Sequence, residues 1–78
     1  MGFEAMLKRA RERAGLTQQA LAERTGLPLR SIQNWEQGHR VPRVGVLLTL
    51  ARALRANVEQ LLLAMAEAAQ PPKKKGGK

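Results

Sequence analysis

The segment Thr17–Gly38, TQQALAERTGLPLRSIQNWEQG, constrains the fold of this 78-residue chain more than any other stretch. It contains two short helical patterns, residues 18–25 and 29–37, separated by one tight corner. Gly26 stands at that corner, where a residue that adopts positive φ lets a helix stop and the chain turn sharply. The segment therefore predicts two short helices joined by a sharp turn.

The second of these patterns divides into two faces at about 100° per residue. One face carries Ile32 and Trp35, which we expect to enter a core. Trp35 could instead act as a wedge between DNA bases, but it shares the angular position of Ile32, so we predict that it packs inside. The opposite face carries mainly amides and a guanidinium, from Leu29, Arg30, Gln33, Asn34 and Gln37. Arg, Asn and Gln match purine edges in the major groove, and a second helix bearing them is typical of a DNA-reading helix-turn-helix.

Many spaced residues of the chain resemble the phage repressor and Cro-type family, also called the xenobiotic-response-element (XRE) family. They are Thr17-Gln18, Leu21-Ala22, Gly26, Ser31-Ile32, Trp35-Glu36, Gly38, Pro42 and Leu47-Leu48, continued by Leu50-Ala51, Ala53-Leu54 and Leu61-Leu62. The resemblance covers roughly residues 5–63. It implies an all-α fold, a compact five-helix bundle of the lambda-repressor-like DNA-binding type, over residues 1–69.

Three further helical patterns flank the central pair. The first, residues 3–14, repeats apolar residues at spacings of three and four and is followed by Gly15. The pattern at 44–55 predicts a buried stripe, and the pattern at 58–69 follows a capping-box signal made by Asn57 and Gln60. The expected stripe of the 44–55 helix consists of Val44, Leu47, Leu48, Ala51 and Leu54.

The last pattern carries more apolar surface than one side of a bundle can cover. Leu61, Leu62 and Met65 share one face, together with Val58, while Leu63 points elsewhere. These leucines and Met65 could simply close the core and leave Leu63 exposed, which is normal for a single leucine. Alternatively they form a two-fold dimer interface, the commonest oligomeric arrangement and a frequent one in the family that the chain resembles.

The resemblance also implies which residues contact DNA. Base reading falls to four positions of the second helix: Leu29, Arg30, Gln33 and Asn34. Arg30 suits guanine and Asn34 suits adenine, whereas Leu29 cannot donate a hydrogen bond and would at most pack on a thymine methyl. The candidates for phosphate contact are Gln18, Ser31, Gln37, Arg40 and Arg43.

Arg11 and Glu36 are a pair of a different kind. The resemblance implies that they form a structural ion pair linking the first helix to the recognition helix. The alternative is that both are ordinary surface charges.

The positive net charge of the chain favours a polyanionic partner such as DNA. The formal net charge is +8, but PPKKKGGK at the end holds four lysines, and residues 1–70 carry ten basic and six acidic residues. A basic surface attracts phosphates in a salt-dependent manner. Residues 70–78 are expected to form a disordered basic tail, either a DNA-attracting extension or a solubilising end without a task.

The remaining composition argues against catalysis and membrane insertion. A lone His, no Cys and six scattered carboxylates suggest neither a catalytic dyad nor a metal site, and we expect no cofactor. No apolar run is long enough to span a membrane. We expect a cytoplasmic, nucleoid-associated regulator, most often a repressor in this family, that binds double-stranded DNA as a homodimer. The alternatives are an antitoxin-like module that also binds a toxin, and a helix-turn-helix fold that reads no sequence.

Overall fold

The regular secondary structure of residues 2–69 consists of helices. The computed structural model describes residues 2–69, so the expected basic tail at 70–78 lies outside the described residues. The helices are α1 (Phe3–Arg13), α2 (Gln18–Thr25), α3 (Leu29–Glu36), α4 (Val44–Leu54) and α5 (Val58–Ala69), and residues 2–69 contain no strand. The all-α expectation is confirmed.

Short polar side chains cap the N-terminal ends of two helices, and the sequence analysis predicts the second of them. The Thr17 Oγ1 atom accepts a hydrogen bond from the backbone N–H of Ala20 at 3.0 Å, before α2. The Asn57 Oδ1 atom does the same for the N–H of Gln60 at 2.9 Å, before α5. Pro28 occupies the cap position of α3 and provides no side-chain hydrogen bond. Such caps satisfy helix N–H groups that have no partner within the helix.

The chain adopts a left-handed backbone conformation at or just after the C-terminal end of each of the helices α1 to α4. Gly15, Gly26 and Gly38 have φ of 75°, 77° and 83°, and Arg55, at the end of α4, has φ of 53°. The N–H groups of Arg55 and Ala56 donate to the carbonyls of Arg52 and Ala51, a Schellman pattern. Glycine adopts this conformation without steric cost, whereas arginine does not. Of these four helices, α4 is therefore the one that is followed by a residue with backbone strain.

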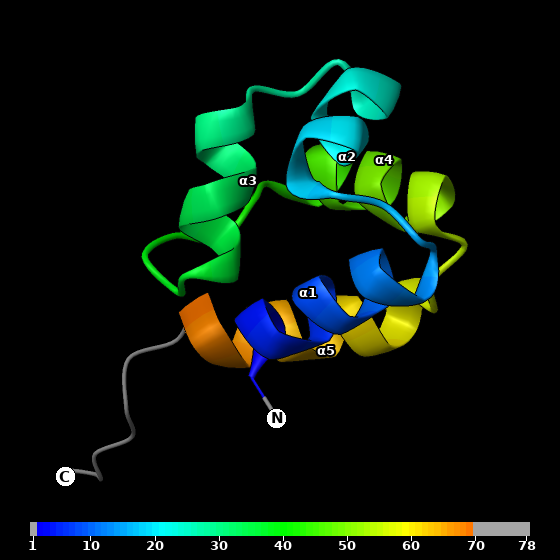
Figure 1. Cartoon of the computed structure of the whole chain (residues 1–78). Helices are drawn as coiled ribbons and strands as arrows, with labels where there is room; N and C mark the ends of the chain where they lie inside the picture. The colour runs from blue at the N-terminus through cyan, green and yellow to red at the C-terminus, as the bar shows by residue number, and fades with distance from the viewer. Residues whose placement is uncertain (1, 70–78) are drawn as a thin grey trace, which may run out of the picture.

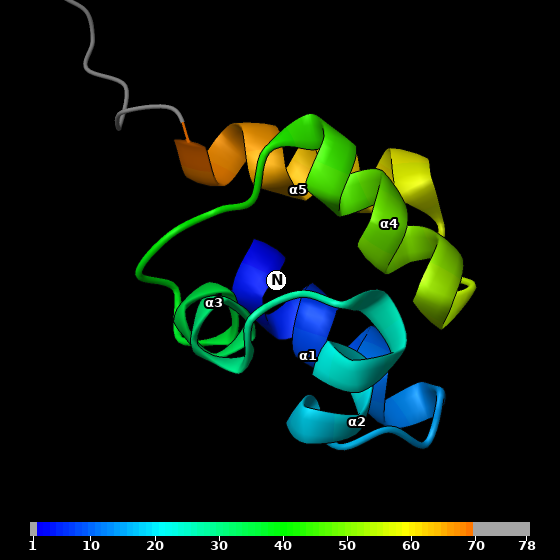
Figure 2. The same cartoon turned by 90° about the horizontal axis from the view of Figure 1, so that it is seen from above.

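The five helices surround one apolar core. α1 lies against α3 and α5, while α4 lies against α2 and α5 (Figures 1 and 2). The largest fully buried side chains are Phe3, Leu7, Leu21, Ile32, Leu47 and Leu50. Trp35 is also buried, which confirms that it packs in the core. Because α3 contributes both Ile32 and Trp35, its remaining face must point outward.

The buried stripe of α4 differs from the sequence-based expectation. Val44 and Leu48, expected inside, are 54% and 39% exposed, and Leu50 is completely buried. Leu47, Leu50, Ala51 and Leu54 follow the same three-and-four spacing, rotated around the helix. Two apolar stripes overlap in this leucine-rich helix, and only contact with α2 and α5 selects one of them.

We predict that Arg55→Gly stabilises the domain, because it removes the strain of a left-handed arginine. The expected gain is about 1 kcal/mol, which corresponds to a rise in Tm of roughly 4–8 °C for a domain of this size. Thermal unfolding followed by circular dichroism measures it. The matched control Arg52→Gly lies in the right-handed last turn of α4 and should lower stability, since glycine disfavours helix. Destabilisation by both changes would contradict the strain argument.

Candidate nucleic-acid interface

The outward face of α3 collects the side chains that the sequence assigns to base reading. Leu29 and Arg30 are exposed, and Gln33 and Asn34 are half-buried. All four belong to one eight-residue helix, whose opposite side is fixed in the core by Ile32 and Trp35. The structure therefore presents a guanidinium and two amides together on one rigid element.

Arg11 and Glu36 form a buried ion pair between α1 and the end of α3. Arg11 Nε donates to Glu36 Oε2 at 2.6 Å, and Arg11 Nη2 donates to Glu36 Oε1 at 3.0 Å. Arg11 Nη1 donates to the backbone carbonyl of Leu16 at 2.8 Å. Such two-pronged contacts fix geometry as well as supply energy. The ion pair thus sets the position of α3 relative to α1, as the resemblance implies.

The hydrogen bonds to Glu36 raise the pKa of Arg11 above its usual value, and burial, which lowers that pKa, has a smaller effect. A group whose folded pKa is raised stabilises the fold fully at every pH below its unfolded pKa. That contribution of Arg11 is lost as the pH rises through the range of arginine. The ion pair therefore holds α3 in place throughout the neutral range.

Gln18 joins this pair from the first turn of α2. Its Nε2 atom donates to Glu36 Oε1 at 3.0 Å, so one carboxylate connects α1, α2 and α3. The sequence assigns Gln18 to a phosphate and does not anticipate this contact, because the two residues lie 18 positions apart. The contact of Gln18 with a DNA phosphate stays a prediction. It would use the free backbone N–H groups at the start of α2, because the side-chain amide already donates to Glu36.

The remaining phosphate candidates lie at the two ends of α3 and beyond it. Ser31 is half-buried in the first turn, and Gln37 is exposed directly after the last one. Arg40 and Arg43 are exposed in the loop before α4. Val41 packs against the core in that loop and Pro42 is buried, so the loop is held down between the two arginines.

The candidate dimer residues separate into two groups. Leu61 and Met65 are buried in the core of their own chain. Leu62 and Leu63 remain exposed, at 37% and 61%. Only these two of the four candidates can offer surface to a second subunit.

Among residues 2–69, no helix is long and apolar enough to cross a membrane. Within the same residues, no three His, Cys, Asp or Glu side chains gather where they could hold a metal ion.

Two short helices at a sharp corner, the second with its polar face outward, define a helix-turn-helix protein of the DNA-binding class. The family model for helix-turn-helix proteins matches residues 7–61, more than half of the chain. The chain belongs to this family of XRE, Cro and lambda-repressor-like helix-turn-helix proteins, a family of DNA-binding transcription regulators. No curated protein matches the chain.

We predict that Glu36→Ala destabilises the domain by about 3 kcal/mol or more, because it leaves the buried Arg11 guanidinium without its counter-charge. Glu23→Ala is the matched control, since Glu23 is exposed on α2, and its effect should stay within about 0.5 kcal/mol. Urea unfolding of both variants measures the difference. Similar losses for the two would show that the ion pair contributes nothing specific.

Proposed function

We propose that this protein is a sequence-specific DNA-binding transcription regulator, a repressor, that reads the major groove with α3. The observation that supports it best is the outward face of α3, on which Arg30, Gln33 and Asn34 lie together. The Glu36 contacts with Arg11 and Gln18 hold that face in a fixed orientation. A reader that is rigid before it binds loses little conformational entropy on binding.

Each residue of the outward face has a role that follows from its chemistry. Arg30 donates two hydrogen bonds to the O6 and N7 atoms of guanine, and Asn34 pairs with the N6 and N7 atoms of adenine. Gln33 forms a hydrogen bond with a neighbouring base, and Leu29 packs on a thymine methyl. Arg30 and Asn34 thus select purines, while Leu29 contributes only an apolar contact.

The flanking residues position the reader on the backbone. Arg40 and Arg43 meet phosphates from the loop before α4, and Gln37 and Ser31 do so from the ends of α3. The start of α2 at Gln18 supplies a further phosphate contact. Phosphate contacts fix the register of a protein on the duplex without reading its sequence.

A homodimer completes the proposal, with its two-fold contact at Leu62 of α5. Leu63 lines a groove together with Arg9, Arg13, Arg24 and Arg55, and a two-fold contact there would place like charges opposite each other. Leu62 does not line that groove. We propose that the two copies present their α3 helices to successive major grooves, and that the regulator acts at the nucleoid in the cytoplasm.

Selection of bound duplexes from a random DNA library, at about physiological salt, tests the function. The expected result is an inverted repeat with half-sites about 10 base pairs apart. Binding without any enriched sequence, lost steeply as salt rises, would reduce the interaction to charge attraction and refute the proposal.

We predict that Arg30→Ala weakens binding to the selected sequence by about 1–3 kcal/mol and relaxes the preference at one base pair. Arg52→Ala removes the same charge from an exposed position of α4 and should lower binding to all sequences slightly and equally. Fluorescence anisotropy with selected and shuffled duplexes separates the two effects. An equal loss on both duplexes for Arg30→Ala would rule out base reading by this residue.

We predict that Leu62→Gln raises the dissociation constant of the dimer roughly tenfold, whereas Leu63→Gln leaves it nearly unchanged. Both side chains are exposed, so neither change should disturb the core of the single subunit. Sedimentation equilibrium over a range of concentrations measures the constant. The reverse order of effects would move the interface to the arginine-lined groove.

A further inference from the structure

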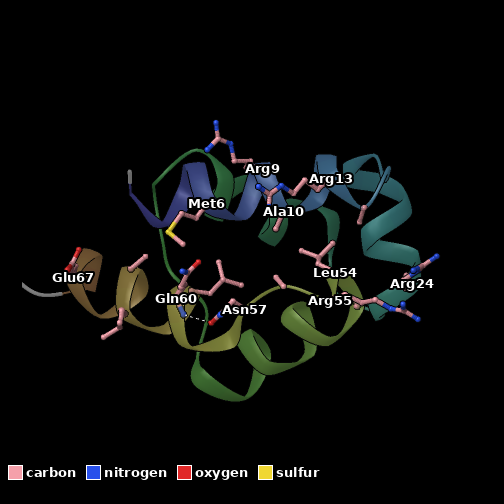
Figure 3. A pocket seen from close by; sticks show the side chains of 16 residues that line it. Met6, Arg9, Ala10, Arg13, Arg24, Leu54, Arg55, Asn57, Gln60 and Glu67 are labelled. Carbon is pink, nitrogen blue, oxygen red and sulfur yellow. Dashed lines mark hydrogen bonds between the residues drawn. The ribbon is translucent and has the colours of Figure 1, made fainter.

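A groove of about 940 Å³ lies between α1 on one side and the corner of α4 and α5 on the other (Figure 3). The end of α2 contributes Arg24 to it. None of the lining residues belongs to α3 or to the loop of residues 37–43. The groove is therefore separate from every side chain to which we assign a DNA contact.

The floor of the groove is apolar and built from small side chains. Leu54 and Leu61 line it together with five alanines, which are Ala10, Ala14, Ala53, Ala56 and Ala64. The small side chains leave space between α1 and α5 into which the ridge of another helix can pack. An amphipathic helix in an apolar groove is a recurring mode of protein recognition.

The edge of the groove is strongly basic. Arg13, Arg24 and Arg55 are exposed, and within residues 2–69 their side chains form no ion pair and no hydrogen bond. Glu67 is the one carboxylate among the described lining residues, and it lies at the opposite end from Arg24 and Arg55 (Figure 3). Unpaired guanidinium groups beside an apolar floor favour a ligand that has both carboxylates and apolar side chains.

Arg55 adds a second reason to regard this edge as functional. Arg55 follows α4 and has a left-handed backbone conformation, with φ of 53°. The corresponding positions after α1, α2 and α3 are occupied by glycine. A strained residue at a surface site is a reason to look for a function of its side chain. Here that side chain is one of the three unpaired guanidinium groups at the groove.

We propose that this groove binds an acidic amphipathic helix of a partner protein, with its apolar face on the alanines and its carboxylates over Arg13, Arg24 and Arg55. A second copy of the chain is disfavoured, because a two-fold contact would set four arginines and one glutamate against the same set. Residues 70–78 carry four lysines and no acid, so they lack the complementary charge. The inference does not depend on the proposed DNA reading, since the two faces share no residue.

Selection from a displayed library of random 14-residue peptides, with the full chain as bait, tests the proposal. Peptides that also bind the double variant Arg24→Ala/Arg55→Gly are removed by counter-selection. The surviving peptides should carry Asp and Glu together with apolar residues at helical spacings of three and four. A synthetic copy of one survivor is then the probe for binding and for nuclear magnetic resonance.

The synthetic peptide should bind the double variant about tenfold more weakly than the unaltered chain, because two exposed ion pairs are lost. Lys8→Ala/Arg52→Ala removes two cations from exposed positions outside the groove and should leave the affinity almost unchanged. Amide shifts should concentrate at residues 53–56 and in α1. The double variant should remain folded, since Arg55→Gly relieves strain, and its circular dichroism checks this.

Three results would overturn the proposal. The first is a selection that yields no survivors, or survivors without an excess of acids. The second is an equal loss of affinity in the two double variants, or amide shifts on α3, which would indicate general charge attraction or binding at the DNA-reading face. The third is a dimer of the chain that Arg24→Ala/Arg55→Gly disrupts, which would assign the groove to a second copy. DNA selection with the same double variant reports on the regulator function independently.

Discussion

The contact between Arg11 and Glu36 is the interaction on which the reading face depends. α2 and α3 have eight residues each, and isolated helices of that length are marginal in water. Their orientation must therefore come from tertiary contacts. Glu36 receives hydrogen bonds from Arg11 of α1 and Gln18 of α2, so a single carboxylate orders three helices. Burial excludes water from these bonds and makes the loss of either partner costly.

That anchoring decides which side of α3 faces solvent. Ile32 and Trp35 bury one side, and Glu36 secures the end of the helix. The remaining arc carries Arg30, Gln33 and Asn34 outward. The same eight residues thus provide one face for packing and another for the proposed base recognition, and the packed face holds the outward side chains in a defined arrangement.

The arginines of residues 2–69 serve different physical purposes, although they contribute equally to net charge. Arg11 is buried and structural, and the proposed DNA contacts use Arg30, Arg40 and Arg43. Arg13, Arg24 and Arg55 lie at the edge of the groove between α1 and α5, and Arg55 has a strained backbone conformation. If both proposals hold, the protein can hold DNA and an acidic protein segment at the same time, because the arginines of the groove lie away from the proposed reading face.

The helices and the family could be predicted from the sequence, because they depend on local signals such as the periodicity of Ile32 and Trp35 and the glycine at 26. The choice between the two overlapping stripes of α4 depends on packing against α2 and α5, which leaves Val44 and Leu48 exposed. The tertiary structure also joined Gln18 to Glu36 and gathered Arg24 and Arg55 at one groove. These features depend on contacts between residues far apart in the chain, and helical spacing contains no information about which distant surfaces meet.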